Sequence, residues 1–268
     1  MEIDLFRDSD TVKFLRLAAL EGWITDDWEL GLLRTAFPKG CLVRRVRRVP
    51  VAFVTAMRHD RSGWIGNLLV DPELRRRGLG TELMKQAVTA LEAAGVETIW
   101  LTASPSGRPL YEGLGFREVD RVHRWLGKDR VVTITPCRQE PLELIRAIDA
   151  EGWGDRRETM VSALASGGNL ISGHGSFLIT RRVGPFRQIG PWAGSPAGAQ
   201  ALFAQVVEPS PRGDTVCLDV PSRNEVISLF LDRCGFLLAG STVLMYSGEA
   251  PAYRPERVCA LASMGSMG

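Results

Sequence analysis

A short glycine-rich basic stretch limits what this chain can fold into more than any other feature of its sequence. Residues 70–80 read Val-Asp-Pro-Glu-Leu-Arg-Arg-Arg-Gly-Leu-Gly; they follow an apolar run at 64–69 and precede a segment of helical periodicity at 81–94. This order predicts a strand, a loop and a helix. The glycines let a ligand approach the backbone, and the N–H groups that begin a helix attract anions. We therefore expect the loop to bind a diphosphate, with Arg75 and Arg77 adding charge-assisted hydrogen bonds.

The spacing of these glycines excludes two common nucleotide-binding loops. A Walker loop requires Gly-Lys followed by Ser or Thr, and a dinucleotide fold requires Gly-x-Gly-x-x-Gly; this run has neither. The run Arg75-x-x-Gly78-x-Gly80 resembles instead the acyl-CoA loop of the GNAT N-acetyltransferase superfamily, whose pattern is Arg or Gln, two residues, Gly, one residue, and Gly or Ala. Taken alone, the run has an alternative interpretation, which is a basic start of a helix that binds no ligand.

A second motif lies downstream, after a predicted strand at 98–102. Residues 110–116 read Leu-Tyr-Glu-Gly-Leu-Gly-Phe, which is similar to the Leu-Tyr-x-x-x-Gly-Phe signature of the same superfamily. Two motifs in the expected order make the resemblance of the first half specific. The resemblance implies an α/β (α+β) fold: a mixed, mostly antiparallel sheet flanked by helices, whose two central parallel strands splay apart to admit the pantetheine arm of acyl-CoA.

The resemblance also assigns roles to residues of the first half. It implies that the end of the central strand pairs with the pantetheine arm, that the loop binds the diphosphate of acetyl-CoA, and that Tyr111 protonates the departing thiolate. Proton transfer from a tyrosine of pKa about 10 to a thiolate whose thiol has a pKa of about 8.5 is uphill by about 2 kcal/mol. The alternative is that Tyr111 only packs its ring. The residues expected to bind the carrier are Leu69, Val70, Arg75, Arg76, Arg77, Gly78, Leu79, Gly80 and Thr81.

The sequence contains an internal repeat. Residues 14–23 and 144–153 share a helical pattern that ends in Glu-Gly-Trp, and a Gly-Phe pair recurs in the later part of each half. We interpret this as a tandem duplication, with an acetyl-CoA-binding domain at 1–136 and a second domain at 137–268.

The second copy lacks two features of the first. Its equivalent of the phosphate loop, residues 189–199, contains no arginine, and Leu231 stands where the first copy has Tyr111. We therefore expect a degenerate, non-catalytic GNAT-like domain that completes the acceptor cleft and the sheet edge.

Periodicity and breakers predict the remaining elements. In the first half we expect strands from residue 2 and at 41–45, 51–57, 64–70, 98–102 and 116–125, the last closing the sheet, with helices at 11–20, at 26–37, from about 78, and around Tyr111. In the second half, after a linker at 136–141, we expect helices at 142–150, 156–165, 197–207 and 223–233 and strands that include 177–182 and 215–220.

A general base is harder to identify. The predicted central strand has no acidic residue, whereas many members of the family place a glutamate there. A water chain is one alternative, and His59, Asp60, Glu21 and Asp26 are the others. A lone histidine beside a hairpin end is expected at the surface. The base matters because an alkylammonium of pKa about 10.4 must lose a proton before it attacks, at a cost of about 4.6 kcal/mol at pH 7.

Aromatic and acidic residues border the predicted turn between the first two helices. Trp23 and Trp28 could sandwich an apolar or planar substrate, or they could pack in the core; the recurrence of Trp23 as Trp153 favours packing. Asp26, Asp27 and Glu29 could attract a cationic amine. An aspartate followed three residues later by a glutamate is also typical of a helix start with acids in its first turn, and we favour capping.

Composition narrows the function. The formal net charge of the 268-residue chain is only +2, which gives no electrostatic reason to expect nucleic-acid binding. The sequence has no apolar run of membrane-spanning length and no signal-peptide pattern at its N-terminus, so we expect no membrane association and a cytoplasmic protein. The five cysteines show neither zinc spacing nor a close pair, and we expect no metal.

These observations predict an N-acetyltransferase that transfers an acetyl group from acetyl-CoA to a primary amine by direct attack. A small-molecule amine is the expected acceptor, and a protein amine is the alternative. Two other interpretations are a non-catalytic CoA-binding regulatory or interaction protein, which the intact Tyr111 disfavours, and a purely structural protein, which leaves the arginine loop unexplained. The acceptor, the acyl-chain length and the oligomeric state are left open by the sequence.

Overall fold

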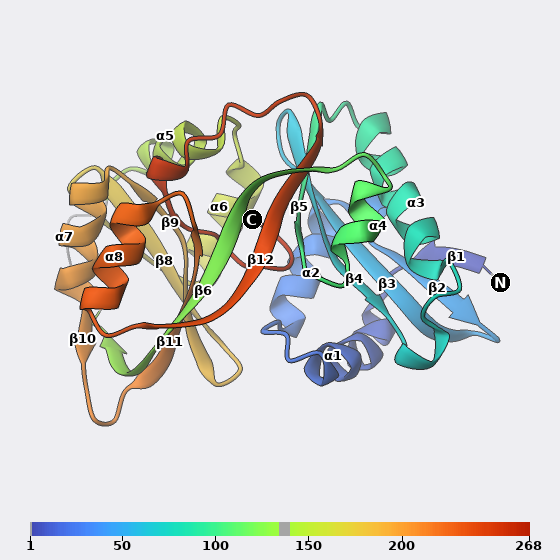
Figure 1. The fold of residues 1–268 in the computed structure, drawn as a ribbon, viewed down its shortest axis with the longest axis horizontal. Helices are drawn as coiled ribbons and strands as arrows, with labels where there is room; N and C mark the ends of the chain where they lie inside the picture. The colour runs from blue at the N-terminus through green and yellow to red at the C-terminus, as the bar shows by residue number, and fades with distance from the viewer. Residues whose placement is uncertain (1, 134–139) are drawn as a thin grey trace.

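The computed structural model describes residues 2–133 and 140–268, and its elements follow one another in two similar series (Figure 1). The first series is β1 (Glu2–Leu5), η1 (Asp8–Asp10), α1 (Thr11–Leu20), α2 (Asp27–Ala36), η2 (Pro38–Gly40), β2 (Leu42–Val46), β3 (Val49–Arg58), β4 (Ser62–Val70), η3 (Pro72–Leu74), α3 (Leu79–Ala93), β5 (Thr98–Ala103), α4 (Arg108–Glu112) and β6 (Arg117–Val132). The second is α5 (Leu142–Trp153), α6 (Glu158–Gly167), β7 (Asn169–Gly173), β8 (Ser176–Val183), β9 (Phe186–Gly194), α7 (Pro196–Val206), β10 (Val207–Pro209), β11 (Asp214–Pro221), α8 (Glu225–Arg233), β12 (Leu237–Gly248), η4 (Pro255–Arg257) and β13 (Val258–Ala260).

The predicted elements are present, with ends that differ by a few residues. The main difference is the strand expected at 116–125, which extends as β6 to Val132. Most of the linker expected at 136–141 lies outside the described residues.

The described strands form one mixed, mostly antiparallel sheet that passes from one half of the chain into the other. Its order is β1-β2-β3-β4-β5-β12-β6-β11-β9-β8-β7, with β10 paired to β6 and β13 paired to β9. Helices cover both faces: along β3, Phe53 and Met57 join the cluster that includes α1 and α2, whereas Val54 and Ala56 join the cluster that includes α3. This alternation follows from the two-residue period of a strand.

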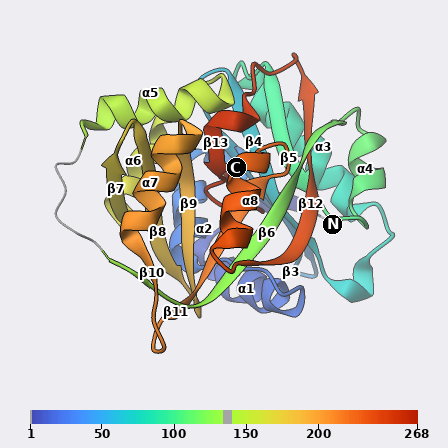
Figure 2. The ribbon, with the colours of Figure 1, turned by 60° about the vertical axis from the view of Figure 1, so that its left-hand side comes forward.

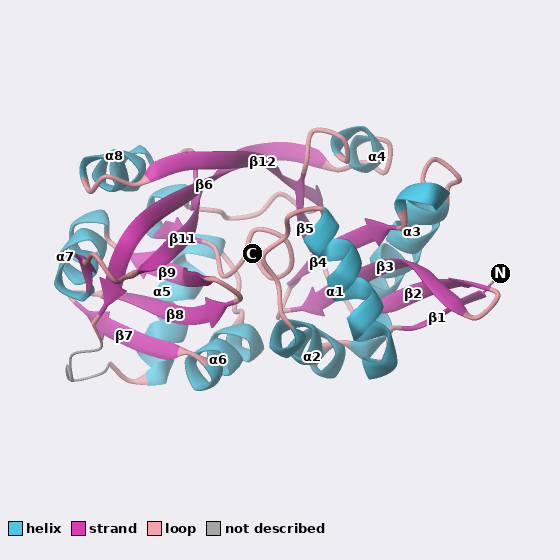
Figure 3. Cartoon of the chain, turned by 90° about the horizontal axis from the view of Figure 1, so that it is seen from below, coloured by secondary structure: helices cyan, strands magenta, loops and turns pink. Residues whose placement is uncertain are grey.

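The expectation that a strand after residue 116 closes the sheet of the first half is wrong. β5 pairs with β12, and β6 lies between β12 and β11, so β6 of the first series and β12 of the second each pair with strands of the other series. Figures 1 and 3 show β6 and β12 running as long strands from one lobe to the other. A strand pattern predicts that residues pair but not with which partner, and the repeat supplies two equivalent partners.

The two central parallel strands of the first half splay apart, as expected. β4 and β5 pair only from Ser62 opposite Thr98 to Trp64 opposite Trp100, and no further pairs are formed along their described length. Beyond that point β4 carries a bulge opposite β3, with Asn67 at a φ of 55°. A bulge of this kind increases the local twist and redirects the strand, which opens a gap between β4 and β5.

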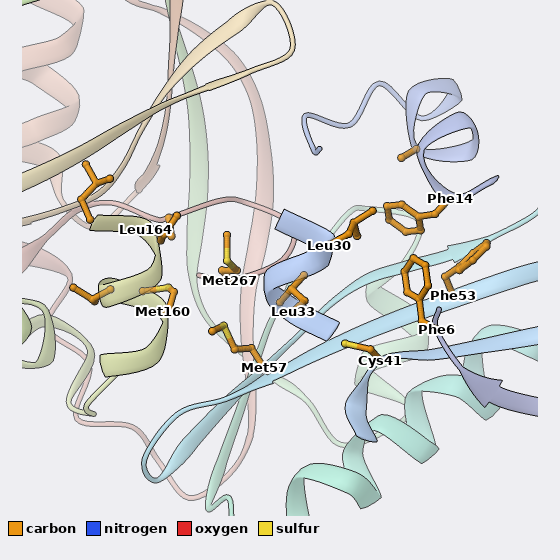
Figure 4. Close-up of a cluster of buried hydrophobic side chains, with 14 of the residues drawn as sticks. Phe6, Phe14, Leu30, Leu33, Cys41, Phe53, Met57, Met160, Leu164 and Met267 are labelled. Carbon is orange, nitrogen blue, oxygen red and sulfur yellow. The ribbon is translucent and has the colours of Figure 1, made fainter. Parts of the chain in front are cut away.

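The hydrophobic core is shared by the two halves. One cluster joins Phe14 and Leu30 of the first half to Met160 and Leu164 of the second. Figure 4 shows Met267 lying between the side chains of α2 and α6 in this cluster. Residues 258–268, which we call the 258–268 segment, therefore pack inside the molecule, and Figure 2 shows the end of the chain between the lobes.

Candidate active site

A cavity of about 610 Å³ lies where β4 and β5 separate. Its walls come from the region between α1 and α2 with the start of α2, from β4 with the loop that follows, from the end of β5 with α4, and from the second half of the chain. The second half contributes Thr242 of β12 and Ser263, Met264 and Gly265 of the 258–268 segment, and the long strand β6 contributes Arg124. The cavity thus joins the residues of both sequence motifs to residues that the motifs did not predict.

The glycine-rich loop presents free backbone donors to this cavity. Arg76 and Gly78 adopt left-handed conformations, with φ of 61° and 79°, and turn the chain into α3. Gly78 is the N-cap of α3 and has no side chain to accept a hydrogen bond from the first turn. The N–H groups at the start of this 15-residue helix are therefore available to an anion, at the positive end of the helix dipole.

Gly78, Leu79, Gly80 and Thr81 all line the cavity. A Cβ added to Gly80 would make only ordinary contacts, the nearest 3.6 Å from Val70, so the folded chain itself does not demand glycine there. The absence of a side chain at this position instead leaves the helix start open to a bound group.

The three arginines of the loop occupy different positions. Arg75 and Arg76 line the cavity, whereas Arg77 is outside its lining and points a guanidinium nitrogen toward the carbonyl oxygen of Glu73 at 3.5 Å. Arg75 contacts the Glu21 carboxylate and donates from Nε to the carbonyl oxygen of Val70 at 3.1 Å. All three arginines are exposed, so solvent screens any charge they add to an anion site.

Leu69, Val70 and Tyr111 all line the same cavity. The ring of Tyr111 packs edge-on against Phe116, with ring centres 6.2 Å apart. Burial raises the pKa of Tyr111 to about 12, so its hydroxyl stays protonated near neutral pH and can donate but not accept a proton.

The two tryptophans considered for the acceptor side occupy different environments. Trp23 lines the cavity. Trp28 is outside the lining: the guanidinium of Arg181 lies 3.9 Å from its ring centre, and its indole packs so closely on Gly167 that a Cβ there would come within 2.3 Å. Trp28 therefore packs against the second half of the molecule.

The four base candidates from the sequence are each either paired with an arginine or outside the cavity lining. Glu21 lines the cavity but is paired with Arg75, and Asp26 caps α2 and pairs with Arg181 at 2.6 Å. His59 is buried, with 8 % of its surface exposed, so the expectation of a surface histidine is wrong. Burial lowers its pKa to about 3, and it lies outside the cavity lining, as does Asp60.

Glu29 is the acidic residue that the sequence interpretation undervalued. Capping of α2 is performed by Asp26, whose carboxylate accepts from the Glu29 N–H at 2.9 Å, while the Glu29 side chain is buried and lines the cavity. Burial raises the pKa of Glu29 to about 7. The signal was its place on the apolar face of the helix, beside Leu30 and four residues before Leu33.

In the second half, the slot equivalent to the gap between β4 and β5 is filled by the chain itself. β9 and β11 pair only over three residues, and β13 then pairs with β9 while the Leu261 N–H donates to the carbonyl oxygen of Asp219 on β11 at 2.8 Å. Ser195 caps the start of α7, and Leu231 is fully buried. In the described part of the second copy, β13 therefore occupies the equivalent slot and a side chain caps the equivalent helix start.

Beyond β13 the 258–268 segment reaches the cavity of the first half. The Asn67 N–H donates to the carbonyl oxygen of Gly265 at 3.2 Å, and the Thr102 hydroxyl donates to that of Met264. The segment thus bridges β4 and β5 where they separate. Among the described residues, no group of three His, Cys, Asp or Glu side chains is placed to hold a metal ion, and none of the described helices is long and apolar enough to cross a membrane.

Comparison with known proteins agrees with this geometry. The acetyltransferase (GNAT) family model matches residues 4–116, and an acetyltransferase (GNAT) domain model matches residues 145–260. The chain belongs to the GNAT acetyltransferase family and carries two of its domains in tandem.

Two relatives illustrate the range of similarity. The [ribosomal protein bS18]-alanine N-acetyltransferase of Salmonella typhimurium is 46% identical over 55 residues, which are 19% of this chain; the chain spans 37% of the length of that relative. The holothin acyltransferase of Pseudoalteromonas sp. is 26% identical over 276 residues, 92% of each chain.

Solved structures show the same fold over the whole chain. A putative acetyltransferase from Pyrococcus horikoshii matches with a TM-score of 0.83 at 19% identity, over 100% of this chain and 95% of that one. A GCN5-related N-acetyltransferase from Sphaerobacter thermophilus matches with a TM-score of 0.60 at 16% identity, over 92% and 95% of the two chains.

Proposed function

We propose that this protein transfers an acetyl group from acetyl-CoA to a primary amine, by direct attack of the amine nitrogen on the thioester carbonyl. The observation that carries the proposal is that the uncapped start of α3, the gap between β4 and β5, and Tyr111 all open into one cavity. A diphosphate, an extended arm and a thiol leaving group each find a suitable partner there.

The residues present fit a CoA thioester. The N–H groups at Leu79, Gly80 and Thr81 suit the diphosphate, with Arg75 and Arg76 close by. The edge of β4 at residues 69–70 faces the gap and suits the amide groups of a pantetheine arm, which would add to the sheet as a short strand does.

Tyr111 is proposed to donate to the sulfur as the C–S bond breaks. With a pKa of about 12 for this tyrosine and about 8.5 for a thiol, complete proton transfer is uphill by about 3.5 pKa units, or about 5 kcal/mol. This cost exceeds the 2 kcal/mol expected from the sequence because burial disfavours the phenolate. A hydrogen bond from the hydroxyl that strengthens as charge develops on sulfur avoids most of that cost.

The acceptor is proposed to be a small-molecule amine. The acceptor side of the cavity is walled by Trp23, Glu29 and residues 263–265, so both halves of the chain narrow it. The relative that matches both halves is named for holothin, and the relatives named for a ribosomal protein match only 55 residues. A protein amine is the alternative that a substrate screen distinguishes.

The loop assignment is tested with Gly80→Ala, and Gly31→Ala is the matched control. Neither new methyl group meets close atoms in the folded chain, and of the two positions only residue 80 lines the cavity. Acetyl-CoA at 100 times its Kd stabilises by about 2.7 kcal/mol, a rise of about 5–10 °C in Tm. We expect wild type and Gly31→Ala to show this rise and Gly80→Ala to lose most of it; an unchanged rise in Gly80→Ala contradicts the assignment.

Transfer itself is tested by thiol release from acetyl-CoA in the presence of a library of primary amines and short peptides. The proposal expects at least one amine to accelerate release and to gain an acetyl group by mass spectrometry. Carrier binding without release for any amine would support the non-catalytic alternative instead.

A further inference from the structure

Glu29 is a carboxylic acid in the cavity whose contacts leave it free to exchange a proton. Only 2 % of the residue is exposed. The Thr25 hydroxyl donates to its Oε1 at 3.1 Å, and the Ser266 side chain hydrogen-bonds to the carboxylate from the 258–268 segment. Among the described residues, no lysine or arginine forms an ion pair with it, so no fixed cation holds the carboxylate in its charged form.

The other acids that line or flank the cavity are already paired. Glu21 contacts the guanidinium of Arg75. Asp219 is fully buried and accepts two hydrogen bonds from Arg124, at 2.8 and 2.9 Å. Among the described residues, both carboxylates are therefore engaged by a guanidinium, unlike that of Glu29.

A short series of contacts places Glu29 beside the bulge of β4. Ser266, which contacts Glu29, is the neighbour of Gly265, and the carbonyl oxygen of Gly265 accepts from the Asn67 N–H. Residue 67 lies at the bulge, where β4 leaves β5 and where the proposed function requires the thioester carbonyl to approach. The buried carboxyl group and the bulge of β4 therefore line the same cavity and contact neighbouring residues of the 258–268 segment.

The charges around Glu29 suit a group that gains and loses a proton near neutral pH. Burial and the nearby charge of Asp26 raise its pKa, the hydroxyls of Ser266 and Thr25 and the charge of Arg181 lower it, and the net result is a pKa of about 7. This brings its pKa about 2.5 units closer to that of an alkylammonium than an exposed glutamate, which favours proton transfer by about 300-fold.

We propose that Glu29 is the general base of the acyl transfer, and that Ser266 of the 258–268 segment is the residue that positions it. This proposal rests on the proposed function. Glu29 takes one proton from the ammonium group, and the neutral nitrogen forms the C–N bond as the C–S bond breaks. The second nitrogen proton is released as the amide forms, and it replaces the proton that Tyr111 gives to sulfur; the proton on Glu29 passes to solvent.

The test measures thiol release with the best amine from the library, as a function of pH, for wild type, Glu29→Gln, Glu29→Asp and Ser266→Ala. Asp27→Asn, an exposed acid two residues away on the same helix, is the matched control. Acetyl-CoA binding is measured in parallel from the shift in Tm. We expect Glu29→Gln to lose 100-fold or more in kcat with carrier binding unchanged. It should also lose the wild-type inflection near pH 7, and its rate should instead keep rising with pH as the fraction of free amine increases.

The conservative variants separate a base from a residue that only packs. Glu29→Asp should retain a pH-dependent rate, reduced about tenfold by its shorter reach, and Ser266→Ala should shift the pH midpoint upward, because a hydrogen bond to the carboxylate is lost. Asp27→Asn should match wild type.

Three outcomes overturn parts of this account in different ways. If Glu29→Gln keeps its rate within threefold and its pH profile, Glu29 is not the base, and the proposed function stands. If Glu29→Gln loses carrier binding as well as rate, its role is structural. If no amine is acetylated by wild type although acetyl-CoA binds, the proposed function itself fails and this inference falls with it.

Discussion

Replacing Glu29 by glutamine should make the protein more stable at neutral pH and change its response to pH. Between pH 4.5 and pH 7 the folded chain keeps a proton on Glu29 that the unfolded chain has released, because burial raises the folded pKa to about 7 from the ordinary 4.5. The free energy of unfolding of wild type therefore falls across this range relative to a variant that cannot titrate.

The size of the effect follows from the shift in pKa. A pKa shift of about 2.5 units corresponds to about 3 kcal/mol in the free energy of unfolding of wild type. This contribution is fully present below pH 4.5 and is lost as the pH rises through 7. Glutamine has nearly the same shape and can keep an accepted hydrogen bond from Thr25, so packing changes little. The free energy of unfolding of Glu29→Gln, relative to that of wild type, should therefore increase by this amount between pH 4.5 and pH 8.

Urea unfolding at half-unit pH steps measures this difference, and subtraction of the two curves removes the titration of all other groups. Asp27→Asn is again the control, since it removes an exposed carboxylate from the same helix. A constant difference between Glu29→Gln and wild type, within about 0.5 kcal/mol from pH 4.5 to 8, would refute the reasoning that the carboxyl group is buried without a compensating cation.

Three further changes test other parts of the molecule. Tyr111→Phe should lower kcat 10- to 1,000-fold while the rise in Tm with acetyl-CoA is kept; equal loss of both would indicate that the ring only packs. Asp149→Asn should cost about 3–5 kcal/mol in urea unfolding, since it leaves the buried guanidinium of Arg157, bound at 2.7 and 2.9 Å, without its partner. His59→Leu should resist acid better than wild type: the folded pKa of His59 is lowered to about 3, so the wild type loses about 3 kcal/mol between pH 6.5 and pH 4, and parallel acid unfolding curves would contradict this.

Local features of the fold could be predicted because their causes are local. The glycines and arginines at 75–80 specify a strand, loop and helix by short-range geometry, and the structure contains β4, the loop and α3 in that order. The splay of β4 from β5 came from the family resemblance and is confirmed by the three-residue pairing. The exchange of β6 and β12 could not be predicted, because their pairing depends on contacts between residues more than one hundred positions apart.

The same distinction explains the site. The loop residues and Tyr111 could be singled out because they form motifs, whereas Trp28 and Glu29 contact the second half of the chain, which no local motif encodes. Trp28 packs on Gly167 and Arg181, and the carboxylate of Glu29 meets Ser266. A sequence pattern at residues 26–29 cannot distinguish a helix cap from a cavity acid when the wall opposite is more than two hundred residues away.

The second half of the chain has a physical role that does not require it to bind a carrier. Its parallel strands β9 and β11 still splay, but β13 occupies the opening between them. β13 pairs with β9, and the N–H of the following Leu261 donates to β11, so the chain is held on both sides of the opening. The residues that follow reach across to β4 and β5 and form the wall opposite Glu29. The opening between the parallel strands of the second half cannot hold both a carrier and β13. The loss of the loop arginines and of the tyrosine, which is leucine at 231, is therefore consistent with an opening that holds β13 and so fixes the segment that completes the cavity of the first half.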